Sequence, residues 1–371
     1  MPTNEAAWLG SAFAELSVRP APYTPPAADQ IVIRNRALAI NPLDDVKQSS
    51  GDLMYRWLPY PVILGEDVAG EVVEVGSAVT RFSVGDRVLA YAVGMEKGRD
   101  HRPEGGFQHY TVASAALASP LPAAMRFEEA VVLPLAISTA ASALFQADQL
   151  GLRHPTAVSQ ATGEVVVVWG GSTSVGSNAV QLAVAAGYTV VSTASPRNHD
   201  RVRELGATHV FDYASETVVQ DIVGAIAGAP VAGVFAIGTG SAEPSVAIAV
   251  ATGAKRVAMA SPSVSMASLP RHKGPSVALV RMGGKLVASN VALQVRCRIH
   301  GIRARFVWGS SLMNNEVGPM LWEQFLPAAL ADGSYVAAPV AEVVGTGLSA
   351  IQPALEAMHR GVSARKLVVL L

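Results

Sequence analysis

The chain has 371 residues, of which 50% are apolar and 15% are charged, and its formal net charge is −1 at pH 7. This length exceeds one ordinary hydrophobic core, so we expect two domains. The near-neutral charge without a basic stripe excludes a nucleic-acid surface, and the single cysteine, Cys297, excludes a disulfide framework and a cysteine-cluster zinc site. Because we find neither an apolar run of membrane-spanning length nor a signal peptide, we expect a cytoplasmic protein without a membrane partner.

The first third of the chain is predicted to be mostly β structure. Gln30 to Ile40 alternates between apolar and polar residues, and Pro61 to Gly76 and Arg81 to Leu89 are strand-like runs with glycine turns. Short strands with few helical stretches indicate a barrel-like β domain. From Phe127 to Phe145 the apolar residues recur at the helical period, which predicts a helix.

A glycine turn in the middle of the chain predicts nucleotide binding. Val165 to Trp169 is an uninterrupted apolar run, the pattern of a strand buried on both faces of a parallel sheet. A turn, an alanine-rich helix ending at Gly187 and a second strand, Thr189 to Ala194, complete a unit of the size of a dinucleotide-binding βαβ motif. A turn that needs glycine for steric reasons alone is the alternative. The predicted cofactor contacts, whose amides would face a pyrophosphate, are Gly171, Ser172, Thr173, Ser174, Val175 and Gly176.

The end of the second strand favours NADPH over NADH. An NAD site usually has Asp or Glu about 20 residues after the glycines, and here no acid occurs before Asp200. Hydroxyl and guanidinium groups suit a 2′-phosphate, which a carboxylate would repel. The alternative is a Ser-Pro turn with a solvated arginine. The predicted contacts are Thr193, Ser195, Arg197 and Asn198.

Strand-like and helix-like segments alternate after this unit, which predicts a doubly wound α/β domain with a parallel sheet. The strand-like runs are His209 to Phe211, Val231 to Ile237, Arg256 to Ala260 and Ile302 to Trp308. The helix-like segments between them are Glu216 to Ala227 and Pro244 to Ala251. Ser261 to Lys273 is predicted to be a loop, and the chain ends in a helix, Leu348 to Met358, and an apolar strand, Lys366 to Leu371.

Several segments together resemble the medium-chain dehydrogenase/reductase superfamily. In order they are NPLD, GEDVAGEVVEVG, FSVGDRV, GGFQHYTV, LPLAISTA and WGGSTSVG, and they span essentially the whole chain. The chain most resembles the zinc-independent quinone and enoyl reductase branch, in particular the fungal trans-acting polyketide enoyl reductases of the lovastatin and ToxD-like type. This resemblance implies a GroES-like, mostly β substrate domain, residues 1–135 and 310–371, around a Rossmann NADP-binding domain, residues 136–309.

The motifs also predict that no metal is bound. Zinc-using members of the superfamily have Gly-His-Glu where this chain has Gly65-Glu66-Asp67, and no cysteine precedes Cys297. Two adjacent carboxylates without His or Cys seldom hold zinc. Without a Lewis acid, hydride addition to a double bond conjugated with a carbonyl is favoured, because hydrogen-bond donors can stabilise the resulting enolate.

The resemblance points to two candidate donors, Lys47 and Thr139. Lys47 follows the Asn41-Pro42-Leu43-Asp44 segment, one position later than the commonest family spacing, and the alternative is an ordinary surface lysine. Thr139 lies beside the nicotinamide in relatives, and the alternative is a Ser/Thr pair that bonds back to its own helix. For Tyr213 two interpretations are open: its ring lies against the adenine, or it belongs to the hydrophobic core. The remaining predicted cofactor contacts are Asn41, Pro42, Ser138, Tyr213, Ile237 and Gly238.

We therefore predict NADPH-dependent, zinc-independent reduction of an activated C=C bond. The expected substrate is an enoyl thioester, either a small molecule or bound to a carrier protein. A quinone or enone oxidoreductase is one alternative, and an NADPH-binding protein without activity is another. The resemblance is compatible with a monomer and with a homodimer, and it leaves the substrate's length, its methylation and the proton donor open.

Overall fold

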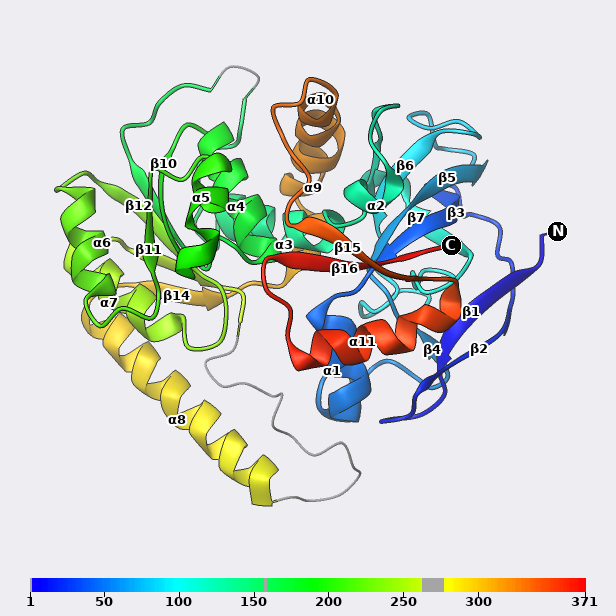
Figure 1. Cartoon of the computed structure of the whole chain (residues 1–371), viewed down its shortest axis with the longest axis horizontal. Helices are drawn as coiled ribbons and strands as arrows, with labels where there is room; N and C mark the ends of the chain where they lie inside the picture. Colours follow the sequence, from blue (N-terminus) through cyan, green and yellow to red (C-terminus); the bar gives the residue numbers. More distant parts are fainter. Residues whose placement is uncertain (1, 157–158, 262–276) are drawn as a thin grey trace. The chain divides into compact units, whose positions relative to one another are not determined.

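The chain is known from a computed structural model that describes residues 2–156, 159–261 and 277–371 (Figure 1). Its described residues form two compact units. The first unit contains residues 2–135 and 318–371, and the second contains residues 136–261 and 277–317. All but the first residue of the predicted loop Ser261 to Lys273 lie outside the described residues.

The second unit ends at Val317, whereas the sequence placed its end at residue 309. The difference arises because the short helix η4 (Gly309–Asn314) is bonded to α3 (Pro134–Phe145). Oγ of Ser142 on α3 donates to the carbonyl oxygen of Gly309 at 3.0 Å. This contact ties η4 to the second unit.

Strands dominate the first unit, as its glycine-rich sequence predicts. Its larger sheet has seven strands in the order β15-β16-β3-β5-β6-β8, with β7 paired to β3, and a small sheet has the order β2-β1-β4. The strands are β1 (Asn4–Leu9), β2 (Leu16–Ala21), β3 (Gln30–Ala39), β4 (Val62–Ile63), β5 (Asp67–Val75), β6 (Arg87–Tyr91), β7 (Tyr110–Ser114), β8 (Ala118–Pro120), β15 (Val340–Thr346) and β16 (Arg365–Leu370).

Both ends of the chain contribute to the larger sheet. The C-terminal strand β16 pairs antiparallel with β3, which aligns Val368 with Ala39, and β15 pairs in parallel with β16. Around these strands lie α1 (Pro42–Ser50), α2 (Phe127–Ala130), the π-helix η5 (Met320–Phe325), α10 (Leu326–Ala331) and α11 (Ile351–Arg360).

The second unit is built on a parallel sheet of six strands in the order β11-β10-β9-β12-β13-β14. All five residues of the central strand β9 are buried, as its uninterrupted apolar run predicts. The strand order reverses at β9, and ligands of open α/β sheets bind at the carboxyl ends of the strands at such a point. The strands are β9 (Val165–Trp169), β10 (Thr189–Ala194), β11 (His209–Asp212), β12 (Val231–Ala236), β13 (Arg256–Met259) and β14 (Arg303–Phe306).

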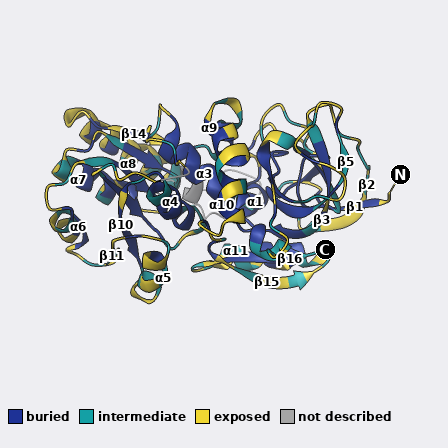
Figure 2. Cartoon of the chain, turned by 90° about the horizontal axis from the view of Figure 1, so that it is seen from above, coloured by how far each residue is buried: buried dark blue, intermediate teal, exposed yellow. Residues whose placement is uncertain are grey.

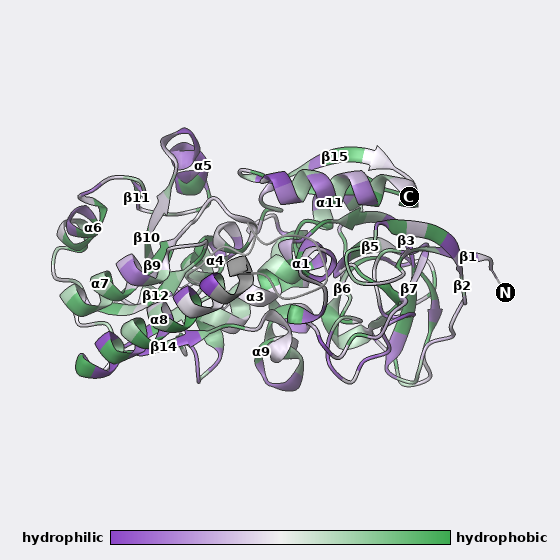
Figure 3. Ribbon diagram, turned by 90° about the horizontal axis from the view of Figure 1, so that it is seen from below, coloured by the Kyte–Doolittle hydropathy of each residue, from purple (hydrophilic) through white to green (hydrophobic). Residues whose placement is uncertain are grey.

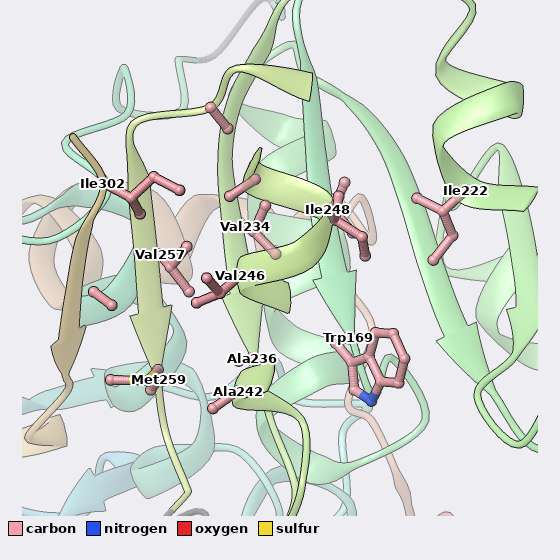
Figure 4. Packing of buried hydrophobic residues seen from close by; sticks show 14 of the residues in the cluster. Trp169, Ile222, Val234, Ala236, Ala242, Val246, Ile248, Val257, Met259 and Ile302 are labelled. Atoms are coloured by element: carbon pink, nitrogen blue, oxygen red, sulfur yellow. The ribbon is translucent and has the colours of Figure 1, made fainter. Parts of the chain in front are cut away.

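Helices cover this sheet, and one hydrophobic cluster fills the space beneath α7. Val234 and Val257 from adjacent strands meet Val246 and Ile248 from α7 in this cluster, which Figure 4 shows. The outer faces of α6 and α7 carry exposed residues (Figure 2). The helices are α4 (Ser174–Ala185), α5 (His199–Glu204), α6 (Val218–Ile226), α7 (Ala242–Thr252) and α8 (Val277–Ile299).

The sequence prediction missed α8, the helices between Val317 and Ala331, and strand β15. In α8 the adjacent Gly283 and Gly284 lower the helix propensity, and outward-facing valines obscure the helical period.

The expectation that no apolar run reaches the length of a membrane span is also wrong. Phe127–Phe145 is long and apolar enough by length and composition, but 83% of the tested stretch is buried inside the protein. It is therefore a core segment of the folded chain.

Candidate functional site

The glycine turn after β9 is held by hydrogen bonds that shape the start of α4. Thr173 is the N-cap of this helix: its Oγ1 accepts the N–H of Gly176 at 3.0 Å and donates to the carbonyl oxygen of Gly170 at 2.8 Å. The first N–H groups of a helix have no partner within the helix, so those of Ser174 and Val175 are the ones available to an anion here.

Two of the glycines are required by close contacts. A Cβ on Gly176 would lie 2.1 Å from the carbonyl oxygen of Gly170, and a Cβ on Gly171 would lie 2.2 Å from Oγ of Ser192. A larger residue at position 176 would push α4 away from the turn, and one at position 171 would displace the Ser192 side chain. In the spacing Gly-x-Gly-x-x-Gly, Thr173 occupies the second glycine position. Its side chain caps α4 there, which a glycine could not do.

The end of β10 carries the residues that we predicted to hold the 2′-phosphate. Thr193 is buried, and its hydroxyl accepts the N–H of Gly170 at 3.0 Å, so it supports the turn from within. Arg197 is exposed, and Ser195 is half-buried, with its hydroxyl 3.2 Å from that of Tyr213. Asn198 is half-buried and ends the short helix η3 (Pro196–Asn198).

Tyr213, Ile237 and Gly238 follow the carboxyl ends of neighbouring strands in the same sheet. The Tyr213 side chain is 49% exposed, which rules out the alternative that it belongs to the core. Ile237 is buried, and the Gly238 amide donates to Oγ of Ser261 at 2.9 Å. The strand ends therefore bring Tyr213 beside Ser195, whereas Ile237 and Gly238 follow β12.

Ser138 and Thr139 lie on α3 within the second unit. A Cβ on Gly309 would lie 2.4 Å from Oγ1 of Thr139, so the threonine hydroxyl is packed directly against this glycine. The hydroxyl of Ser138 is buried without a hydrogen-bond partner among the described residues, so Ser138 does not bond back to its own helix. A buried hydroxyl without a hydrogen bond destabilises the fold unless a ligand or a water molecule bonds to it.

Lys47 in the first unit is completely buried, so the interpretation as a surface lysine is wrong. Its Nζ donates to the carbonyl oxygens of Gly51 and Tyr55, at 3.4 and 3.2 Å, and lies 3.1 Å from Oδ1 of Asp52. It also lies 4.6 Å from the ring centroid of Tyr60. The ammonium group therefore binds the loop that follows its own helix, α1.

Asn41 is also buried, and its side chain is bonded within the first unit. Its Nδ2 donates to Oδ2 of Asp67 at 2.9 Å, and its Oδ1 accepts a hydrogen bond from Nζ of Lys366. The neighbouring Pro42 is exposed and begins α1. Of the two predicted cofactor contacts in this segment, Asn41 is therefore engaged in the packing of its own unit.

The comparisons with known proteins extend over the whole chain. The profile of the alcohol dehydrogenase GroES-like domain matches residues 27–123. The dehydrogenase pigH of Monascus ruber is 47% identical over 372 residues, which cover 100% of both chains. The trans-enoyl reductase himH of Aspergillus japonicus is 37% identical over 369 residues, covering 99% of this chain and 97% of himH. The chain belongs to the medium-chain dehydrogenase/reductase superfamily, in its enoyl reductase branch.

Solved structures of this superfamily confirm the predicted fold class, a Rossmann parallel sheet with a GroES-like, mostly β domain. The CurK enoyl reductase structure has a TM-score of 0.73 at 19% identity and covers 100% of this chain and 99% of its own. An alcohol dehydrogenase superfamily protein from Novosphingobium aromaticivorans has a TM-score of 0.72 at 24% identity, with 100% of both chains covered. As a member of this superfamily, the present chain is an oxidoreductase, and the superfamily implies a nicotinamide cofactor. The glycine turn, the free helix amides and the close approach at Gly176 fit such a dinucleotide.

Sequence reasoning missed a group of buried acids at the position where zinc-using superfamily members have their Gly-His-Glu motif. Glu66, Asp67 and Asp44 are all buried. Oδ1 of Asp67 accepts the N–H of Leu135 at 2.6 Å, and its Oδ2 lies 2.9 Å from Nζ of Lys366. Both Asp67 oxygens are therefore used inside the unit. The signal in the sequence was two acids within an otherwise apolar, glycine-rich strand.

The surroundings of Glu66 disfavour its charged form. Burial, followed by the charges of Asp44, Glu96 and Asp67, raises the pKa of Glu66 well above its ordinary value. Its Oε1 accepts the hydroxyl of Tyr91 at 3.4 Å, and its Oε2 has no hydrogen-bond partner among the described residues.

Asp44 shares this environment. Burial is the main cause that raises the pKa of Asp44 to about 7, and the N–H groups of Asn41 and Gly65, which donate to its oxygens, oppose the shift. Burial therefore favours the protonated form of both carboxyl groups.

Proposed function

We propose that this oxidoreductase reduces a carbon–carbon double bond conjugated to a carbonyl group, with NADPH as the hydride donor and an enoyl thioester as the substrate. Two relatives that match the chain over nearly its full length are named trans-enoyl reductases: himH, and tndF of Aspergillus flavipes at 34% identity. Their names support the reaction class.

The residues at the end of β10 support a preference for NADPH. The first acid after this strand, Asp200, is 2.7 Å from the guanidinium of Arg203 and is engaged on α5. The surface before it offers the hydroxyl of Ser195 and the guanidinium of Arg197. These groups suit a 2′-phosphate better than a ribose hydroxyl.

The donor set at the Glu66–Asp67 position supports a reaction without zinc. Asp67 is already bonded to Leu135 and Lys366, and burial raises the pKa of Glu66, which disfavours the carboxylate form that binds a divalent ion. Charge that develops on the substrate carbonyl oxygen then has to be stabilised by hydrogen-bond donors.

We assign different roles to the two predicted donors. Bound NADPH would supply the hydride to the β-carbon, which moves negative charge onto the carbonyl oxygen as an enolate, and a proton then adds to the α-carbon. Thr139 is the proposed donor to the enolate oxygen. Lys47 has its hydrogen bonds directed to Gly51, Asp52 and Tyr55, so we propose it as a positioning residue.

The test is NADPH oxidation with crotonyl-pantetheine, using NADPH deuterated at the transferred position. We expect the label on the β-carbon. A label on the carbonyl carbon, or turnover of quinones without turnover of the thioester, would overturn the proposal.

The role of Thr139 is tested with two matched variants. Thr139→Val keeps the shape of the side chain and removes the donor, whereas Thr139→Ser keeps the donor. The valine variant should lose about 10²- to 10³-fold in kcat with NADPH binding retained, and the serine variant should keep most of it. Equal rates for both variants would show that Thr139 is not the donor.

A further inference from the structure

The helix α8 carries a row of exposed aliphatic side chains. Val287, Val291, Val295 and Ile299 follow one another at four-residue intervals, and between 54% and 74% of each is exposed. Residues four apart lie on the same side of a helix, so these four form one ridge, which we call the α8 ridge. Figure 3 shows hydrophobic and hydrophilic residues along this helix.

The α8 ridge faces away from the unit to which the helix belongs. Leu293 and Cys297 on α8 are buried in the hydrophobic cluster of the second unit. Each lies two residues from a ridge valine, which is about 200° around the helix. Figure 1 shows the first turns of α8 extending beyond the sheet of its own unit. Because large contiguous apolar patches are uncommon on monomeric proteins, the ridge is a candidate interaction surface.

Positive charge flanks the ridge on both sides. The sequence of α8 contains four cations and no acidic residue. At 100° per residue, Arg296 and Arg298 project on opposite flanks of the ridge, whereas Arg281 and Lys285 precede its first residue and lie further around the helix. All four are exposed, and no ion pair formed by the described residues includes them. These cations are Arg281, Lys285, Arg296 and Arg298.

This pattern favours an acidic protein over the other possible occupants. A second copy of the chain would bring two all-positive helices together, which like-charge repulsion opposes. An anionic membrane would suit the cations, but the ridge lacks the Trp, Phe and Leu side chains that anchor interfacial helices. An acidic protein surface with an apolar stripe would satisfy both the ridge and its flanks.

We propose that the α8 ridge and its flanking cations bind an acidic face of the protein that carries the thioester substrate. The inference rests on the proposed function, because only a substrate tethered to a protein requires that protein to bind. It assigns the recognition of the carrier to a helix of the nucleotide-binding unit.

The test compares the same acyl group bound to a carrier protein and as a free thioester. The probe is the acyl carrier domain of a fungal polyketide synthase loaded with crotonyl-phosphopantetheine, and the reference substrate is free crotonyl-pantetheine. The double variant Val291→Glu with Val295→Glu should lower kcat/KM for the carrier-bound substrate by at least about tenfold and leave that for the free thioester nearly unchanged. The control is Val84→Glu, at a valine of the first unit that is 65% exposed, and it should change neither.

The charges are tested with Arg296→Gln and Arg298→Gln together. This variant should weaken the binding of the labelled carrier domain, and added salt should weaken binding to the wild type more than to the variant. An equal loss for both substrates in the valine variant, or no preference of the wild type for the carrier-bound substrate, would overturn the proposal.

Other outcomes separate the remaining possibilities. A wild-type dimer that the valine variant converts to a monomer in sedimentation would make the ridge a contact between copies and overturn the proposal. Binding to vesicles of equimolar phosphatidylserine and phosphatidylcholine that the valine variant abolishes would do the same in favour of a membrane. If the wild type reduces neither thioester, the proposed function fails. Carrier binding measured by fluorescence anisotropy then still decides the inference. Loss of binding in the valine variant supports it, and no binding by the wild type overturns it.

Discussion

Nζ of Lys366 lies 2.9 Å from Oδ2 of Asp67, and both side chains are buried. Lys366 belongs to β16 near the end of the chain, and Asp67 is the first residue of β5. Lys366 also donates to Asn41, which is the N-cap of α1. One ammonium group thus links three separate segments of the first unit.

Removing this ammonium group should destabilise the protein strongly. Lys366→Met keeps the aliphatic stem but leaves Asp67 and Asn41 buried without their cation, which typically costs about 3–5 kcal/mol in the free energy of unfolding. Urea denaturation measures the loss, and Lys97→Met, at an exposed lysine, is the control. A loss as small as that of the control would mean that the buried pair contributes nothing.

The buried acids predict that stability falls as the pH rises. The pKa of Glu66 is raised above its ordinary value of 4.5, and that of Asp44 is raised to about 7, so the folded chain holds protons that the unfolded chain releases. Their stabilising contribution is fully present below the unfolded pKa values and is lost as the pH rises through the folded ones. We expect the free energy of unfolding to decrease from about pH 5 to about pH 8.

The variant Glu66→Gln isolates one of these acids. Glutamine resembles the protonated side chain and cannot ionise, so the variant should show a shallower decrease over the same pH range. Urea denaturation at several pH values provides the comparison. A pH dependence identical to that of the wild type would show that Glu66 is ionised in the folded protein.

Gly176→Ala should disrupt the glycine turn. The added Cβ would meet the Gly170 carbonyl oxygen at 2.1 Å, so α4 has to shift at an overpacking cost of about 1–3 kcal/mol. We expect NADPH affinity to fall at least about tenfold in a fluorescence titration. Gly224→Ala is the matched control. Gly224 lies in α6, and an added Cβ there would have no atom within 4 Å, so this variant should stabilise the protein by about 0.5–1 kcal/mol.

The strand end at β10 predicts cofactor selectivity. NADPH should bind at least about tenfold more tightly than NADH, which corresponds to about 1.4 kcal/mol. Arg197→Ala should reduce the affinity for NADPH much more than that for NADH, whereas Arg203→Ala, at the residue paired with Asp200, should affect both equally. Isothermal titration with both cofactors decides this, and equal affinities in the wild type would refute the prediction.

Lys47→Met separates a positioning role from a catalytic one. Removing the ammonium leaves the carbonyl oxygens of Gly51 and Tyr55 without their donor, at about 1–3 kcal/mol each. We expect a lower Tm and a raised KM with kcat within about tenfold of the wild type. A fall of kcat by about 10²-fold or more at unchanged Tm would instead identify Lys47 as a donor to the substrate.

The sequence predicted the parts of the protein that are local along the chain. The buried strand Val165–Trp169 and the turn containing Gly176 have their causes within neighbouring residues, and the structure shows both. The contacts of Lys366 with Asn41 and Asp67 join residues that the sequence keeps far apart, so no periodicity or spacing reports them. Lys47 was ambiguous for a related reason, because its burial depends on how the loop after α1 folds back.

The pairing of β16 with β3 also determines when the protein can fold during synthesis. The parallel sheet of the second unit uses residues 165–306, which are contiguous in the chain and leave the ribosome before the C-terminal strands. The sheet of the first unit lacks β16, and Asp67 lacks Lys366, until residues 365–370 have been translated. The N-terminal strands, although made first, therefore wait for β16, and a nascent chain that stops before Arg365 leaves residues 37–39 of β3 without this partner.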